Sequence, residues 1–398
     1  MTGKPRHIGV AERRARLGLR QRLADAARGT TPEEVADSLV ALHGTDPATV
    51  YLAVGARLAD AGETVAQVER ALYEDRSLVR MHGMRHTVFV FPGALAAVVH
   101  ASTALDIAAK ARAGLVKDMT AGSGGRLTEA WLDEVEASAL AALARRGQAT
   151  VNELTGDEPR LKEQFPYAAG KSYEGVHTVS SRLMRVLGVE GRVVRGRPLG
   201  SWTSSQFRWA IAPPYPELPP AEARSELLNR WLMACGPATE ADLKWWTGWK
   251  VTDVRRALAA SGAVAVSLDD GLTGYVAAGD DGPVEEPGAP WAALLPALDP
   301  APMSRPERDW FLEPSMRPAL FDRSGNVGPT VWWDGRVVGG WAQRPDGEIV
   351  WRLPAGQDVG REARDAIAAE AERLRAWVGE TRITPRFRTP LERELSAE

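Results

Sequence analysis

The sequence contains little of what marks several common protein classes. It has one cysteine, Cys235, which excludes an intrachain disulfide and a cysteine-rich zinc site. No run of about 18 apolar residues occurs, and no apolar stretch follows the basic N-terminus, so we expect neither a membrane span nor a secretion signal. P-loop, GxGxxG and nucleophile-elbow motifs are absent as well. These absences favour a cytoplasmic protein and make a small-molecule enzyme the least favoured class.

The sequence also lacks the positive net charge that many nucleic-acid-binding proteins carry. Its formal net charge is -3 over 398 residues, so any DNA-binding surface must be local. Only seven of the 49 basic residues are lysines. The planar fork of arginine suits phosphates and base edges, although a biased genome composition produces the same ratio. The length predicts about two to four domains.

Internal repetition is the most informative feature of the chain. The pattern G-x-A-T-x-x-acid-L occurs twice, at residues 147–154 (GQATVNEL) and 236–243 (GPATEADL). An amphipathic helix is predicted before each copy. The threonines, Thr150 and Thr239, are placed to cap the N-terminus of a second helix. Residues 180–196 and 251–267 then each predict a third helix, a glycine stop and a strand that turns back through another strand.

A third copy fits the N-terminal part of the chain. We expect its helices at residues 11–27, 30–42 and 65–75 and its strand pair at 77–84 and 85–91. Three helices followed by a two-stranded hairpin form the winged helix-turn-helix, which in most of its uses places its third helix in the DNA major groove. Winged helices also serve as protein-protein scaffolds, and that alternative stays open for each copy.

Charge distinguishes the copies. From His177 to Arg197 one acidic residue, Glu190, accompanies five arginines that we predict to contact DNA phosphates: Arg182, Arg185, Arg192, Arg195 and Arg197. The last wing is acidic at its turn, around Asp269, and would repel DNA, so we expect it to be structural. Residues 243–250 (LKWWTGWK) are expected to form a packed face rather than a stacking platform for bases.

The pattern changes to strands near Trp291. We expect strands within residues 289–300, 330–343 and 347–355, hairpin turns at two Asp-Gly pairs, a helix at 360–379 and a final strand at 381–387. The predicted fold class is therefore α+β, with tandem winged-helix domains followed by a β-rich, barrel-like domain. The expected domains are winged helix 1 with the candidate site, winged helix 2 with the basic wing, winged helix 3 and the C-terminal domain, at 1–125, 126–216, 217–285 and 286–398.

Residues 41–58 (ALHGTDPATVYLAVGARL) set His43, Thr45 and Asp46 in a short polar row between apolar segments. Asp46 before Pro47 is a sufficient helix start, with the aspartate as N-cap and the proline at the first helical position. His43 ends an apolar helical face, where a histidine bonded to a nearby carbonyl is ordinary. The six histidines show no strong metal-ligand spacing.

With these segments in hand, the chain resembles the winged-helix family that contains the AlkZ/YcaQ-like DNA glycosylases, which unhook bulky alkylated or cross-linked purines. In the glycosylase members a Gln-x-Gln or Gln-x-Asp motif supplies the catalytic pair, and His43 and Thr45 stand at those positions here. A second landmark, an arginine-threonine strand ending in histidine, appears as Arg85 and Thr87 with Phe89 at the histidine position. The resemblance runs along nearly the full length and is clearest in residues 39–58, 294–300, 317–341 and 384–395.

The resemblance implies a DNA-binding protein whose Arg85 and Thr87 face DNA. In the enzymatic case the protein is a monofunctional DNA glycosylase that excises alkylated purines: His43 is the base that polarises a water, and Thr45 or Asp46 orients it. The alternative is a non-catalytic DNA-binding or regulatory protein on the same scaffold. Either way we expect double-stranded DNA as the partner, alkylated in the enzymatic case, with no metal or other cofactor, no membrane, and a monomer.

Overall fold

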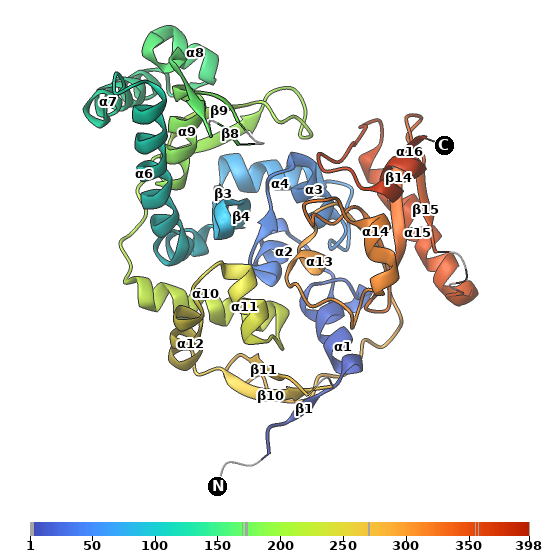
Figure 1. The fold of residues 1–398 in the computed structure, drawn as a ribbon. Helices are drawn as coiled ribbons and strands as arrows, with labels where there is room; N and C mark the ends of the chain where they lie inside the picture. The colour runs from blue at the N-terminus through green and yellow to red at the C-terminus, as the bar shows by residue number, and fades with distance from the viewer. Residues whose placement is uncertain are drawn as a thin grey trace.

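The computed structural model describes residues 4–168, 170–171, 174–269, 271–354, 356 and 358–397. It is an α+β structure in which several small sheets are held together by helices (Figure 1). The segment 126–216 forms the lobe at the upper left of Figure 1, and 217–285 lies below it. The segment 286–398 forms the lobe at the right, and the first segment lies between them.

The second segment shows the repeated pattern most fully. Thr150 caps α8 in a capping box with Glu153, and Gly191 takes φ 73° between α9 and β8, so the predicted cap and glycine stop are confirmed. The strand β5 pairs with β9, which pairs with β8. The elements are α7 (Glu129–Arg146), β5 (Gln148–Ala149), α8 (Val151–Asp157), a 3-10 turn (Pro159–Lys162), the hairpin β6 (Gln164–Tyr167) and β7 (Gly175–Thr178), α9 (Val179–Val189), β8 (Val193–Pro198) and β9 (Phe207–Ile211).

The first segment has the same order of elements, but its first helix is not where the sequence predicted it. The expected helix at 11–27 is shorter, α1 (Val10–Arg20), and lies outside the repeat. The repeat starts with α2, which ends where Val40 takes φ 65°, and Asp46 and Pro47 start an additional helix, α3. The sheet order is β2-β4-β3, as in the second segment. The elements are α2 (Pro32–Leu39), β2 (Leu42–His43), α3 (Pro47–Gly55), α4 (Thr64–Glu69) with a π-helical turn (Arg70–Glu74), β3 (Leu78–His82) and β4 (Val88–Pro92).

The third segment repeats the order again in shorter form. An isolated bridge from Ala238 to Tyr275 takes the place of the first strand, Thr239 caps α11, and Gly262 takes φ 68° before β10. The N-terminal strand β1 (His7–Ile8) adds to this sheet in parallel with β10. The elements are α10 (Pro220–Cys235), α11 (Glu240–Thr247), α12 (Val251–Ala260), β10 (Val264–Leu268) and β11 (Thr273–Val276). The winged-helix interpretation of all three segments stays a prediction.

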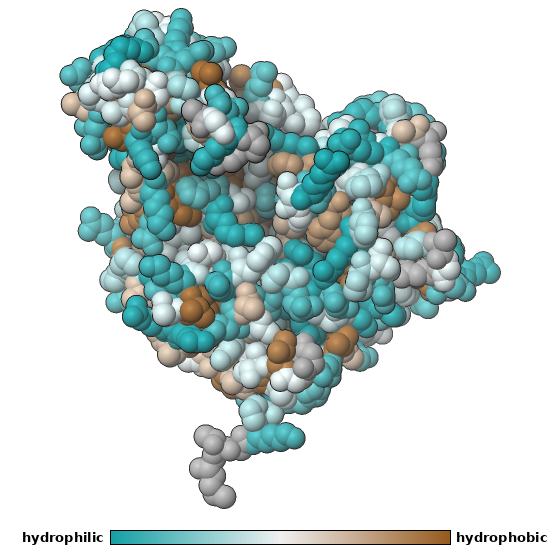
Figure 2. Space-filling model, in the orientation of Figure 1, coloured by the Kyte–Doolittle hydropathy of each residue, from teal (hydrophilic) through white to brown (hydrophobic). Residues whose placement is uncertain are grey.

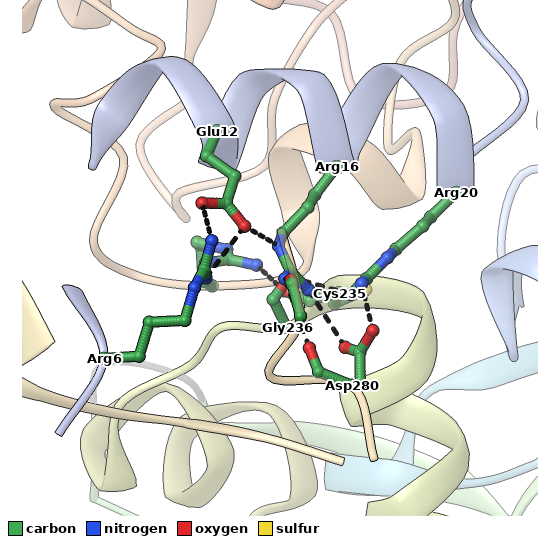
Figure 3. Close-up of polar contacts among 9 residues, drawn as sticks. Arg6, Glu12, Arg16, Arg20, Cys235, Gly236 and Asp280 are labelled. Carbon is green, nitrogen blue, oxygen red and sulfur yellow. Dashed lines mark hydrogen bonds and ion pairs between the residues drawn. The ribbon is translucent and has the colours of Figure 1, made fainter. Parts of the chain in front are cut away.

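Buried arginines attach α1 to the third segment (Figure 3). Arg16, 1% exposed, bonds Glu12 at 2.9 Å and Asp280 at 3.0 Å, and Arg20 donates to the same Asp280 carboxylate. The acidic wing turn acts in the same way, because Asp269 accepts hydrogen bonds from the His7 ring and from the Val10 amide. The expected structural role of this wing is therefore seen in its contacts.

The C-terminal segment corrects two predictions. Its described strands form an open antiparallel sheet in the order β12-β13-β14-β15, so the barrel-like expectation is wrong: β12 and β15 do not pair to close the sheet. Residues 381–387 form no strand, and their backbone is held by side-chain bonds such as Ile383 N to Gln343 Oε1 at 2.8 Å. The elements are β12 (Ala292–Leu295), α13 (Pro300–Met303), α14 (Arg317–Leu320), β13 (Thr330–Trp333), β14 (Arg336–Gln343), β15 (Ile349–Arg352), α15 (Gly360–Val378) and α16 (Pro390–Ala397).

The hydrophobic cores cross the predicted domain boundaries. One core joins the first segment to the C-terminal sheet and α15, another joins it to α10–α12, and a third lies mostly within the second segment. The four-domain division stays a prediction.

One described helical run, Gly93–Gly122, is long and apolar enough to cross a membrane. It includes α5 (Ala96–Val99) and α6 (Leu105–Gly122). Buried core helices pass the same test of length and composition.

Candidate functional site

The row of polar residues predicted as a site lies at the junction of β2 and α3. His43 is on β2 rather than at the end of a helix, because α2 already ends at Leu39. Its partner across the ladder is Phe89 of β4, and the two rings meet edge to face with centroids 5.3 Å apart. Thr45 and Asp46 follow in the two positions before α3 begins.

Asp46 connects this junction to the C-terminal segment. Its Oδ1 accepts the Ala48 N–H at 3.1 Å, which confirms the predicted N-cap, and its Oδ2 accepts the Arg386 N–H at 2.8 Å. The Arg386 guanidinium also donates to the Thr45 carbonyl at 3.4 Å. Burial raises the pKa of the Asp46 carboxyl, while these N–H donors and the Arg386 charge oppose that rise. The sequence did not single out Arg386 as a site residue, since nothing local relates positions 340 residues apart.

His43 is neutral at physiological pH. Burial, with a smaller effect from the Arg85 charge, lowers its pKa to about 4. Its Nδ1 accepts a long hydrogen bond from Thr45 N at 3.5 Å, which assigns the ring proton to Nε2. The imidazole therefore presents an N–H donor to its surroundings, as a glutamine amide would.

His43 and Arg85 line the same small cleft, together with Phe89, Trp246 and Met303. Its volume is about 20 Å³, enough for a water molecule. Asp46 lines a different hollow, against the C-terminal segment. The structure thus brings His43 and Arg85 together but turns the Asp46 side chain toward other partners.

Arg85 lies on a strained turn between β3 and β4. Arg85 and His86 both take positive φ, 54° and 58°, in the region that non-glycine residues seldom occupy. The Arg85 guanidinium stacks over Trp245 of α11 at 4.0 Å, and Thr87 Oγ1 donates to the Arg85 carbonyl at 3.5 Å. In the sequence LKWWTGWK, Trp246 and Trp249 are buried as expected, while Trp245 holds this arginine.

Of the five arginines predicted to bind phosphate, three are paired with acidic residues that lie far away in the sequence. Arg182 bonds Asp118 at 3.3 Å, Arg192 bonds Glu136, and Arg197 bonds Glu69 and Glu74 at 2.8 and 3.0 Å. A paired arginine has part of its charge neutralised before any phosphate arrives. The count of one acidic residue in this stretch is therefore misleading as a measure of its charge.

The other two arginines have no ion pair among the described residues. Arg195 is stacked on Phe207 at 4.5 Å, and its pKa is lowered to about 10 by burial and by neighbouring arginine charges. Arg185 on α9 is exposed. Its charge reaches His86, whose pKa is lowered first by burial and then by Arg185 and Lys110.

These side chains define an exposed basic patch of Arg85, His86, Lys110 and Arg185, contributed by the β3–β4 turn, α6 and α9. None of its members has an ion pair within the described part of the chain. Lys110 was not predicted, because only the packing of α6 against α9 places it here. Such a patch suits a phosphate backbone.

The wing of the second segment is packed rather than free. Trp202, in the loop between β8 and β9, is 8% exposed and lies against Tyr51 of α3 at 5.0 Å and Trp377 of α15 at 6.3 Å. This loop therefore links three segments (Figure 1). Figure 2 shows the surface hollowed between the lobe of α6–α9 and the C-terminal lobe.

No group of three or more histidine, cysteine, aspartate or glutamate residues in the described ranges could hold a metal ion. His82 and His86 do not form such a group.

Comparison with known proteins gives a family and a fold. The model of the family described as DNA glycosylase AlkZ-like matches residues 36–377. Among solved structures, the chain is similar to the Streptomyces sahachiroi DNA glycosylase AlkZ, with a TM-score of 0.70 and 21% sequence identity over 95% of this chain and 98% of that chain. At this identity the likeness concerns the fold. A search of curated protein sequences gives no match.

Proposed function

Because the chain belongs to the AlkZ-like DNA glycosylase family, a DNA-binding repair family, we propose that it binds duplex DNA and hydrolyses the N-glycosidic bond of alkylated purines. The observation that carries this proposal is the neutral His43 imidazole, which lines a cleft shared with Arg85. The three repeated element orders support the tandem winged-helix interpretation, in which α9 is the third helix of its unit and contributes Arg185 to the basic patch.

The chemistry asks little of the protein at the leaving group. An N7-alkylated purine already carries positive charge and departs as a neutral base. The remaining tasks are to hold the sugar, to stabilise the developing oxocarbenium and to position a water on the opposite face. An N–H donor is sufficient to orient this water, and the proton that the water loses as its oxygen bonds to the sugar carbon passes to solvent.

The roles of His43 and Asp46 follow from their protonation. A histidine whose pKa is about 4 is a weak base, so we assign His43 the orientation of water or substrate through Nε2–H rather than proton abstraction. This revises the role expected from sequence. The Asp46 carboxylate holds the junction by accepting the Ala48 and Arg386 N–H groups, and Thr45 positions the imidazole through its backbone N–H.

The replaced family motif fits this assignment. His43 stands where the resemblance places a catalytic glutamine, and Phe89 stands where it places a histidine. These two positions are cross-strand partners whose rings touch, so a change at one alters the surroundings of the other. A protonated Nε2 reproduces the donor of a glutamine amide.

The test is release of 7-methylguanine from a methylated duplex. We expect His43→Ala to reduce release by about 100-fold and His43→Gln to keep it within a few fold, because the amide restores the donor. The wild-type rate should stay level from pH 8 to pH 5, since His43 titrates near 4. His177→Gln, on the distant β7, is the matched control. A rate that falls below pH 6 in the wild type but not in His43→Gln would instead identify His43 as a base.

A non-catalytic DNA-binding function is the second candidate. It is favoured by the small volume of the cleft and by the Phe89 ring that packs against His43. Wild-type protein that binds the methylated duplex but releases no base under any of these conditions would establish this second function.

A further inference from the structure

A large cavity in the described structure lies away from the His43 cleft. Its volume is about 680 Å³, and it lies between the edge strand β3 and its preceding turn on one side and β8, β9 and the chain after β9 on the other. Apolar side chains dominate its wall, among them Leu72, Val79, Ala97 and Tyr215. Cavities of this size and character hold small organic ligands.

One charged side chain in this wall lacks a partner. Arg80 is only 7% exposed, and its Nε and Nη2 have no hydrogen-bond acceptor among the described residues. These two nitrogens are enclosed by the protein, so Arg80 meets the cavity through other atoms of its side chain. Tyr73 lies in the same wall, and its hydroxyl interacts with that of Tyr51. A guanidinium buried in this way is costly unless an anion joins it.

The charges around Arg80 reinforce its preference for an anion. Arg195 lines the same cavity, and the charges of Arg80, Arg386 and Arg185 act with burial to lower its pKa. The carboxylate of Asp46 is within electrostatic reach of Arg80, but its oxygens accept the Ala48 and Arg386 backbone N–H groups. The cavity therefore combines an apolar wall with excess positive charge.

We propose that this cavity binds a small organic anion with an apolar body, whose carboxylate or phosphate lies against the Arg80 and Arg195 side chains that line it and whose body packs on Val79, Ala97 and Tyr215. This goes beyond the proposed action on DNA. A DNA phosphate would use the charge, but it would leave the apolar wall without a function. Neither arginine has an ion pair among the described residues, so the ligand would supply their counter-charge.

The proposal is tested by calorimetric titration of the full chain with 1-naphthyl phosphate. We expect binding that falls by about 10- to 100-fold in Arg80→Met, the loss of a charge-assisted contact. Ala97→Phe should block binding by filling the cavity. Arg76→Met is the matched control, because Arg76 lies exposed at the same cavity and its loss changes the net charge equally.

Stability separates a binding role of Arg80 from a structural one. If Arg80 serves to bind a ligand and has no protein partner, Arg80→Met should unfold at no lower urea concentration than the wild type. If Arg80 is structural, Arg80→Met should unfold at a clearly lower urea concentration. The proposal would be overturned if either Arg80→Met or Ala97→Phe bound 1-naphthyl phosphate as tightly as the wild type does. It would also be overturned if inorganic phosphate bound as tightly as the naphthyl ester. Base release from DNA is measured separately, so failure of the glycosylase proposal leaves this test intact.

Discussion

A buried ion pair between Arg57 and Asp299 holds the candidate site to the C-terminal segment. Both side chains are 0% exposed, and Arg57 Nη1 and Nη2 donate to the two carboxylate oxygens at 2.8 and 2.7 Å. Arg57 also donates to the carbonyls of Gln21 and Ala53, both at 2.9 Å, and Asp299 caps α13 by accepting the Ala301 N–H at 2.9 Å. Arg57 follows α3, the helix whose first turn is capped by the site residues.

We predict that Asp299→Asn lowers the free energy of unfolding by about 3 to 5 kcal/mol. Asparagine keeps the shape and the helix cap, so the loss reports the buried guanidinium that is left without its counter-charge. Arg57→Met should cost a similar amount. Such a loss is a large part of a typical total stability of about 5 to 15 kcal/mol. Urea unfolding followed by the fluorescence of the 14 tryptophans measures it.

The double variant Arg57→Met with Asp299→Asn is the decisive control. With both charges gone, its loss should be smaller than the sum of the two single losses by about 2 kcal/mol or more. A single loss below about 1 kcal/mol for Asp299→Asn, or losses that simply add in the double variant, would refute the reasoning from buried charge.

Three further predictions concern other parts of the molecule. Trp202→Ala should lower the unfolding free energy by about 3 to 5 kcal/mol in urea, and Trp202→Phe by clearly less, because the ring fills a joint core. Burial lowers the pKa of His82 to about 3, so the unfolded state binds more protons than the folded state below about pH 6.5. The free energy of unfolding should therefore fall from pH 6.5 toward pH 3, and it should fall less steeply in His82→Gln. An equal pH dependence of the unfolding free energy in the wild type and in His82→Gln would contradict this prediction. Replacing Arg185 and Lys110 together by glutamine should reduce the slope of the logarithm of DNA affinity against the logarithm of salt concentration by about 1.8 in magnitude. The Arg255 guanidinium is paired with an acidic residue, so Arg255→Gln should leave this slope unchanged.

Local backbone chemistry was predictable from sequence wherever the relevant atoms lie within a few residues of one another. Thr150, Thr239 and Asp46 cap helices as expected, because a cap needs only a side-chain oxygen and an N–H two or three residues ahead. Gly191 and Gly262 end helices with positive φ for the same local reason. The Asp334-Gly335 turn likewise takes positive φ at both positions.

The sequence by itself thus determined the caps, the stops, most helices and strands, the repetition of one unit and the resemblance to a family. Only the tertiary structure decided which arginines are free, since Arg197 meets Glu69 across 128 positions and Arg185 meets no acidic residue among those described. It alone placed His43 against Phe89 and buried the imidazole, which lowers its pKa, and it placed the unpaired Arg80 in the wall of a cavity. The physical reason is range: caps and turns depend on backbone geometry over a few residues, whereas charge, burial and protonation depend on whatever the packed chain brings within a few ångströms.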